Sequence, residues 1–180
     1  MSALWRRLDR PGHDAACLRP LGDGWKLSGV AVFLHESGPA SLEYSVEVDS
    51  RWSTKRGRVT GFIGDAAIGH NIRRSRDKWL LDDVEIEGLA LLLDLDFSFT
   101  PATNLLQLKR AGLQVGQRLA IPAAWFDLDA ATLTELPQHY ERISDTVFRY
   151  AAPSVPYEGL LEISLDGFVE SYPDLWRREA

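Results

Sequence analysis

Residues 42–49, LEYSVEVD, decide the fold class of this 180-residue chain. Leu42, Tyr44, Val46 and Val48 alternate with polar residues at every second position. Successive side chains of a β-strand point to opposite faces, so this alternation predicts a strand with one buried face and one wet face. An amphipathic helix would instead place its apolar residues three and four positions apart.

The same alternation returns in residues 91–100 and in residues 161–166. Gly-Asp, Gly-Pro and Asp-Gly pairs mark turns at hairpin spacing between the alternating segments. Many short strands joined by such turns predict an all-β domain, and a chain of this length without a linker predicts one domain over residues 1–180. Further strand candidates are residues 25–36, 59–64, 78–86 and 146–152.

Helical periodicity is scarce, and we expect few or no long helices. The C-terminal residues 171–180, SYPDLWRREA, predict one short helical turn. Pro173 suits the first turn of a helix, and Arg177 and Arg178 suit its carboxyl end, where the helix dipole is negative.

Composition and charge exclude several classes of protein. The formal net charge of −6 disfavours general nucleic-acid binding, which depends on Lys and Arg side chains that neutralise phosphates. The N-terminal residues lack the apolar run of a signal peptide, and no segment reaches the roughly 18 apolar residues of a transmembrane helix. Cys17 is the only cysteine and cannot form an internal disulfide. We therefore expect a soluble, cytoplasmic protein.

No strong catalytic or metal-binding signature is present. The four histidines fit no metal-ligand spacing, and the chain lacks a nucleophile elbow, a phosphate-binding P-loop and a GxGxxG motif. We therefore expect no catalytic residue, no metal ligand and no cofactor.

Residues 91–104, LLLDLDFSFTPATN, bring polar groups to a bend. Asp94 and Asp96 lie two positions apart on a predicted strand, which places both carboxylates on one face about 6–7 Å apart. Such a pair fits the general acid and base of a glycosidase, and it also fits the solvated face of a sheet, which is the commoner case. The side chains of Thr100 and Asn104 in the following turn can bond to the turn's own backbone or to a sugar.

Two other segments have a possible binding function. Residues 52–59 and 70–79 contain seven Lys and Arg side chains, with Trp52 and Trp79 at the outer ends. If they pair as neighbouring strands, their basic surface suits a phosphate or carboxylate group, or it protects an edge strand. Residues 138–142 alternate Gln, Tyr and Arg on one face, a pattern that suits sugar binding and also fits an ordinary exposed strand.

These features, in this order, resemble a family of bacterial proteins first catalogued as a domain of unknown function and now described as "putative glycolipid-binding". The most specific match is DLDFSFTPATN, residues 94–104, although Gln107 departs from the family pattern, which has proline there. The resemblance spans nearly the whole chain. Its other matching features are Trp5, Pro11, Gly12, residues 42–55, residues 138–142, residues 148–150 and residues 166–178.

The resemblance implies a single antiparallel sheet that curves into a spiral β-roll around an apolar interior, similar to lipoprotein carriers. It also implies that a glycolipid or similar small amphipathic ligand occupies the concavity. An enzyme that acts on a sugar through Asp94 and Asp96, and a protein-interaction domain that uses Trp125 and Phe126, stay open as alternatives. The residues expected to contact the ligand are Trp52, Asp94, Asp96, Thr100, Asn104, Gln138, Tyr140 and Arg142.

Overall fold

Most strands pair with their neighbour in the sequence, because short turns return the chain beside the strand it has just left. The computed structural model describes residues 1–180 and contains a 14-stranded sheet, a 3-stranded sheet and one helix. In spatial order, the strands of the large sheet are β10 (Arg118–Ala120), β13 (His139–Arg142), β14 (Val147–Ala152), β15 (Tyr157–Ile163), β16 (Val169–Tyr172), β17 (Trp176–Arg178), β1 (Ser2–Arg7), β2 (Gly12–Leu21), β3 (Gly24–His35), β4 (Gly38–Val48), β5 (Thr54–Ile63), β6 (Ala66–Ser75), β7 (Lys78–Leu81) and β8 (Val84–Ile86).

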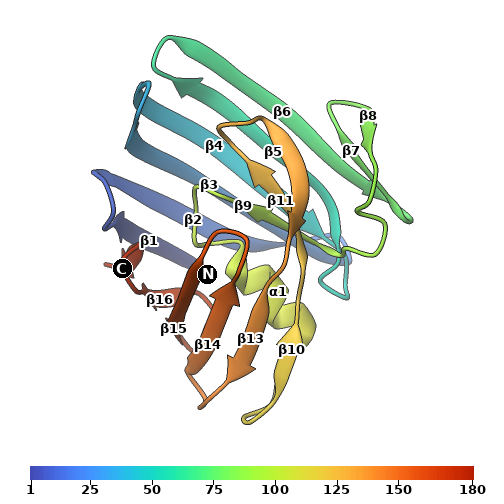
Figure 1. Cartoon of the computed structure of the whole chain (residues 1–180), viewed down its shortest axis with the longest axis vertical. Helices are drawn as coiled ribbons and strands as arrows, with labels where there is room; N and C mark the ends of the chain where they lie inside the picture. The colour runs from blue at the N-terminus through green and yellow to red at the C-terminus, as the bar shows by residue number, and fades with distance from the viewer.

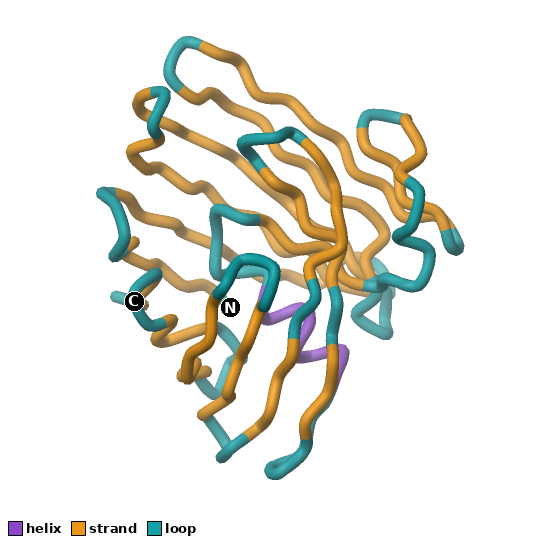
Figure 2. Tube along the Cα trace, viewed as in Figure 1, coloured by secondary structure: helices purple, strands orange, loops and turns teal.

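The large sheet is antiparallel throughout and curves around the remaining elements. Strand β1 pairs with both β2 and β17, so the two ends of the chain lie side by side in the middle of the sheet (Figure 1). The small sheet contains β12 (Thr132–Leu136), β11 (Ala123–Asp127) and β9 (Asp94–Phe97), and its β9–β11 pair is parallel. The helix α1 (Asn104–Ala111), purple in Figure 2, packs near β9 inside the curve.

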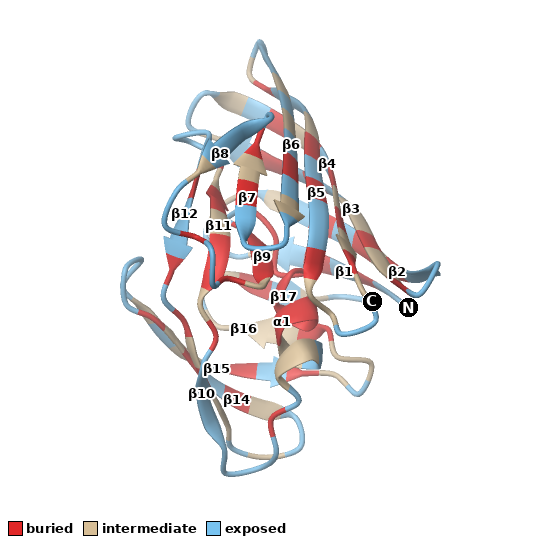
Figure 3. Ribbon diagram, turned by 90° about the vertical axis from the view of Figure 1, so that its right-hand side faces the viewer, coloured by how far each residue is buried: buried red, intermediate tan, exposed pale blue.

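The apolar core fills the inside of this curve. On β3 and β4, the side chains of Leu27, Ala31, Leu42 and Val46 point inward and are fully buried, as the alternation predicts. They belong to a cluster of 31 buried apolar residues, and a second cluster of 10 lies against β13–β16. The buried positions form red bands along the strands in Figure 3. The protein's own side chains therefore occupy the concavity.

The structure confirms the all-β fold and the large curved antiparallel sheet, and it corrects several expectations. Residues 171–180 form no helical turn: residues 173–175 are a turn between β16 and β17, and β17 pairs with β1 through the buried Trp176. The one helix, α1, was not expected. It has only eight residues, and it ends at Gly112, whose φ of 56° favours glycine.

The third correction concerns β9, which is buried on both faces and not on one. The long strands lie against one of its faces and α1 against the other side, so all four of its residues are inaccessible. Close packing against β5 depends on Gly57, because a Cβ there would lie 2.2 Å from Cδ2 of Leu95. Phe126, expected at an exposed surface, is also fully buried, and Trp125 is partly buried.

Candidate functional site

Four of the predicted ligand contacts belong to one buried hydrogen-bond network. Asp96 on β9 accepts a hydrogen bond from Oγ1 of Thr103 at 2.5 Å and one from Nε2 of Gln138 at 3.2 Å. The hydroxyl of Tyr140 accepts from Nδ2 of Asn104 at 2.7 Å and lies 3.1 Å from Oε1 of Gln138. Segments about 40 residues apart in the sequence therefore share their polar groups inside the protein.

Burial and hydrogen bonding shift the pKa of the Asp96 carboxyl in this network in opposite directions. Burial raises the pKa of the Asp96 carboxyl, and the Thr103 hydrogen bond offsets part of that rise. Burial also raises the pKa of Tyr140 well above its ordinary value, so the phenol stays protonated. Gln107 on α1, where the family pattern has proline, also reaches the Tyr140 hydroxyl through Oε1 at 3.1 Å, while its Nε2 has no partner.

Asp94 forms a separate ion pair. Both of its oxygens accept hydrogen bonds from the Arg110 guanidinium, at 2.6–2.9 Å. Burial raises the pKa of the Asp94 carboxyl, and the hydrogen bonds and charge of Arg110 offset part of this. In this structure Asp94 connects β9 to the last turn of α1. The paired carboxylates of the sequence thus contact different partners.

Thr100 contributes to a third buried polar group around Asp14. The Tyr44 hydroxyl lies 2.9–3.0 Å from the two Asp14 oxygens, and the Thr100 hydroxyl donates to the same carboxylate. Burial raises the pKa of Asp14 from 3.8 to about 7, against these hydrogen bonds and the charge of Arg7. Nothing in the alternating segment around Asp14 indicated a buried acid, because its polar partners lie 30 and 86 residues away.

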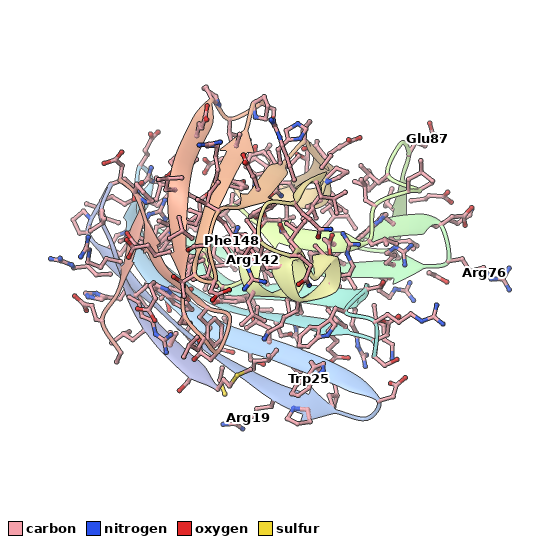
Figure 4. All side chains as sticks on the ribbon, turned by 90° about the horizontal axis from the view of Figure 1, so that it is seen from below. Arg19, Trp25, Arg76, Glu87, Arg142 and Phe148 are labelled. Carbon is pink, nitrogen blue, oxygen red and sulfur yellow. The ribbon has the colours of Figure 1, made fainter.

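Trp52 and Arg142 lie apart from these networks. Trp52 stacks on Trp25 with ring centroids 5.3 Å apart, whereas the Arg142 guanidinium lies over the Phe148 ring and donates to the backbone carbonyl of Leu113. Figure 4 shows Arg142 and Phe148 near the centre of the molecule and Trp25 at its lower side.

Six of the eight predicted contacts are therefore buried and engaged with the protein's own groups: Asp94, Asp96, Thr100, Asn104, Gln138 and Tyr140. Their role in ligand binding stays a prediction.

The largest hollow lies on the opposite side of the long strands, on the face turned away from the core. It is about 830 Å³ in volume and lies over β1–β5. One row of laterally paired residues crosses it, and the members of this row on β1, β2 and β3 are apolar. From β1 to β5 the row is Leu4, Ala15, Val30, Glu43 and Thr60.

The adjacent row in the hollow consists of four small residues followed by one cationic residue, Arg58. The short side chains leave space above the sheet, while the long neighbouring side chains form the walls, which is why the surface is hollowed there. From β1 to β5 this row is Ser2, Cys17, Ser28, Ser45 and Arg58.

Exposed apolar side chains continue from one end of the hollow. Val30, Val32 and Leu34 follow one another on the outer face of β3 and are 42%, 53% and 50% exposed. Phe62 on β5 lies in the same lateral row as Val32.

A basic cleft of about 450 Å³ continues from the other end of the hollow, and it includes Lys26, Arg56, Arg58 and Arg73. The pairing of β5 with β6 places Arg56 opposite Arg73, so the two basic segments do lie on neighbouring strands. Trp52 and Trp79 do not flank this surface as expected: Trp52 stacks on Trp25, and Trp79 is fully buried.

Sequence reasoning missed the hollow itself. Alternation predicts which residues face outward, but only the strand register shows which of them are neighbours. The structure contains no group of three or more His, Cys, Asp or Glu side chains placed to hold a metal ion. It also contains no helix of the length and apolarity needed to cross a membrane.

Comparisons with known proteins agree with the fold. A DUF1089 family protein from Pseudomonas aeruginosa, known from a crystal structure, is similar to this chain with a TM-score of 0.80 and 24% sequence identity, and 92% of each chain is covered. A search of curated proteins found no match. The model of the family described as "Putative glycolipid-binding" matches residues 2–178, and the chain belongs to that family.

Proposed function

We propose that the protein binds an amphipathic ligand with a hydroxyl-bearing head group, a glycolipid or a molecule of that class, on the outer face of β1–β5. The observation that carries the proposal is the hollow of about 830 Å³, which joins an exposed apolar strip to a row of small polar side chains. The family description supports the class of ligand.

The apolar strip formed by Leu4, Val30, Val32 and Leu34 suits an alkyl chain. Burial of one CH₂ group stabilises a complex by about 0.8 kcal/mol, so covering half the surface of an eight-carbon chain contributes roughly 3 kcal/mol. The strip lies on an open sheet face, so the other half of such a chain stays in contact with water. Tail binding alone is therefore weak, and the head group must contribute.

The polar residues of the hollow suit sugar hydroxyls. Ser28, Ser45 and Thr60 are outward-facing, and each hydroxyl both donates and accepts hydrogen bonds. The carboxylate of Glu43 can accept two or more hydrogen bonds. Glu43 lies between Val30 and Thr60 in one lateral row. A sugar placed here finds both donors and acceptors on β3, β4 and β5, beside the apolar strip.

Titration with octyl β-D-glucoside, below its micelle concentration, tests this proposal. We expect amide chemical shifts to change along β1–β5 and calorimetry to give a saturable binding isotherm. Val30→Lys places a charge in the apolar row and should weaken binding at least tenfold. Leu160→Lys is the matched control, because Leu160 is also an exposed apolar residue of a strand, on β15.

Two results would contradict the proposal. One is the absence of saturable binding to the wild-type protein. The other is shift changes centred on Asn104 and Tyr140 with unchanged affinity in Val30→Lys, which would place the ligand among the interior residues expected from the sequence. Thermal unfolding of both variants separates a binding defect from a folding defect.

A further inference from the structure

We infer that the ligand's head group carries an anion, a carboxylate or a phosphate, and that Arg58 is the residue that selects for it. This inference rests on the proposed function and goes one step further, since it specifies the charge of the ligand and its orientation. Arg58 lies where the hollow and the basic cleft join, because it lines both of them, as do Lys26 and Ser45.

The basic cleft has an excess of positive charge although the whole chain has a net charge of −6. It contains four cations, Lys26, Arg56, Arg58 and Arg73, and two carboxylates, those of Glu47 and Asp83, which leaves a local charge of +2. A local positive field in a negatively charged protein attracts anions to this cleft and away from the rest of the surface.

Arg58 is the cation of the cleft whose charge has no partner. Glu47 binds Arg56 at 2.5 Å and lies 3.5 Å from Lys26, while Asp83 binds Arg73. Arg58 has no ion pair, and its lateral neighbours are neutral. These neighbours are Ser45 on β4 and Asn71 on β6.

The neutral neighbours of Arg58 also suit anion binding. A guanidinium offers two parallel N–H donors to a carboxylate or phosphate, and the hydroxyl of Ser45 and the amide of Asn71 add donors beside it. Both residues line the same cleft as Arg58. The three side chains thus present hydrogen-bond donors from three adjacent strands to one cleft.

The charges of the hollow also set the direction of the ligand. Glu43 lies in the lateral row of Val30 and Thr60, so an anion placed beside the apolar residues would be repelled. One row further along the strands, about 7 Å away, an anion meets Arg58. The alkyl chain therefore extends toward Val32 and Leu34, and the anion toward the cleft.

A matched pair of ligands tests the inference. Octyl β-D-glucoside and octyl β-D-glucuronide differ only at C6, where the second has a carboxylate. We expect the wild-type protein to bind the glucuronide about tenfold more tightly, the low end for a charge-assisted hydrogen bond because Arg58 is exposed. Arg58→Gln should remove this preference, so that the variant binds the two octyl sugars with equal affinity, and Arg58→Lys should retain part of it.

Arg76→Gln is the control variant. Arg76 lies in the turn between β6 and β7, at the far tip of that hairpin (Figure 4), and its loss removes the same charge without touching the hollow. It should leave both affinities as they are in the wild type. Raising the NaCl concentration should reduce the glucuronide preference of the wild type, because salt screens exposed charges.

The outcomes separate this inference from the proposed function. Equal affinity of the wild type for the two octyl sugars overturns the inference and leaves the proposed function intact, whereas loss of binding to both overturns both. Equal affinity for octyl glucuronide and for glucuronate without a tail overturns the inference, since the site would then bind a free anion. Self-association of the unliganded protein that Arg58→Gln abolishes also overturns it, because the occupant would be a second copy of the chain.

Discussion

The buried Asp14 carboxyl makes the stability of this protein depend on pH in a direction opposite to that of most acidic side chains. Burial between Tyr44 and Thr100 raises the pKa of Asp14 from 3.8 to about 7. Between pH 3.8 and about pH 7, Asp14 keeps its proton in the folded chain and has released it in the unfolded chain. Raising the pH through this window therefore favours unfolding.

The magnitude follows from the difference between the two pKa values. Each pKa unit between the folded and unfolded states corresponds to about 1.4 kcal/mol, so Asp14 lowers the free energy of unfolding by about 4 kcal/mol as the pH rises from 4 to 8. The contribution is present in full below about pH 4 and is lost as the pH passes 7. Asp14→Asn removes the ionisable group and keeps a side chain of the same shape.

The assay is urea unfolding, followed by tryptophan fluorescence at pH 4, 5, 6, 7 and 8, of the wild-type protein and Asp14→Asn. We expect the free energy of unfolding of the variant, relative to the wild type, to rise by about 4 kcal/mol across this range. Other carboxyls with a raised pKa, Asp94 and Asp96, are present in both proteins, so their contributions cancel in the difference.

Asp9→Asn is the matched control. Burial raises the pKa of Asp9, but the hydrogen bonds and charges of Arg7 and Arg10 outweigh this and leave the pKa lowered. Its stabilising contribution is therefore lost as the pH falls, the opposite sign to Asp14, and the change lies mostly below pH 4. A difference between Asp14→Asn and the wild type that stays constant from pH 4 to pH 8 would refute the reasoning.

Three further predictions concern packing inside the roll. Arg110→Met should lower the free energy of unfolding at pH 7 by about 3–5 kcal/mol, because it leaves the carboxylate of Asp94 buried without its partner. Urea unfolding measures this change, and an effect below about 1 kcal/mol would contradict the buried ion pair. Tyr140→Phe should cost about 1–3 kcal/mol in the same measurement by removing the shared hydroxyl, and an unchanged midpoint would show that the network adds no stability. Gly29→Ala should lower the melting temperature by several degrees, because a Cβ there lies 2.3 Å from the hydroxyl of Tyr44, and normal melting would show that the ring can move aside.

The fold class could be predicted because it depends on local patterns. The alternation of residues 42–49 predicts one buried and one wet face, and β4 has buried Leu42, Tyr44, Val46 and Val48 as a result. The prediction of a C-terminal helical turn was wrong because it used local preferences alone. Local preferences for a first-turn proline and late arginines were outweighed by the pairing of β17 with β1, a strand at the other end of the chain.

The candidate site is harder to predict, because polar residues in a sequence usually indicate exposure to water. The alternation places Asp94 and Asp96 on the polar side of a strand, yet both are buried. A carboxylate can lie in the interior when other groups satisfy its hydrogen bonds, and these groups come from Arg110, Thr103 and Gln138. None of these contacts follows from the spacing of the two acids.

The sequence alone predicts that the chain forms many strands, which side of the long strands faces the core, and which family the chain resembles. That the concavity is filled and that the largest hollow lies on the outer face is seen only in the folded protein. The cause is the strand register, because pairing across five strands places the small side chains of Ser2, Cys17, Ser28 and Ser45 in one row ending at Arg58. Neighbours of this kind are separated by 11 to 17 residues in the chain, and no local pattern specifies them.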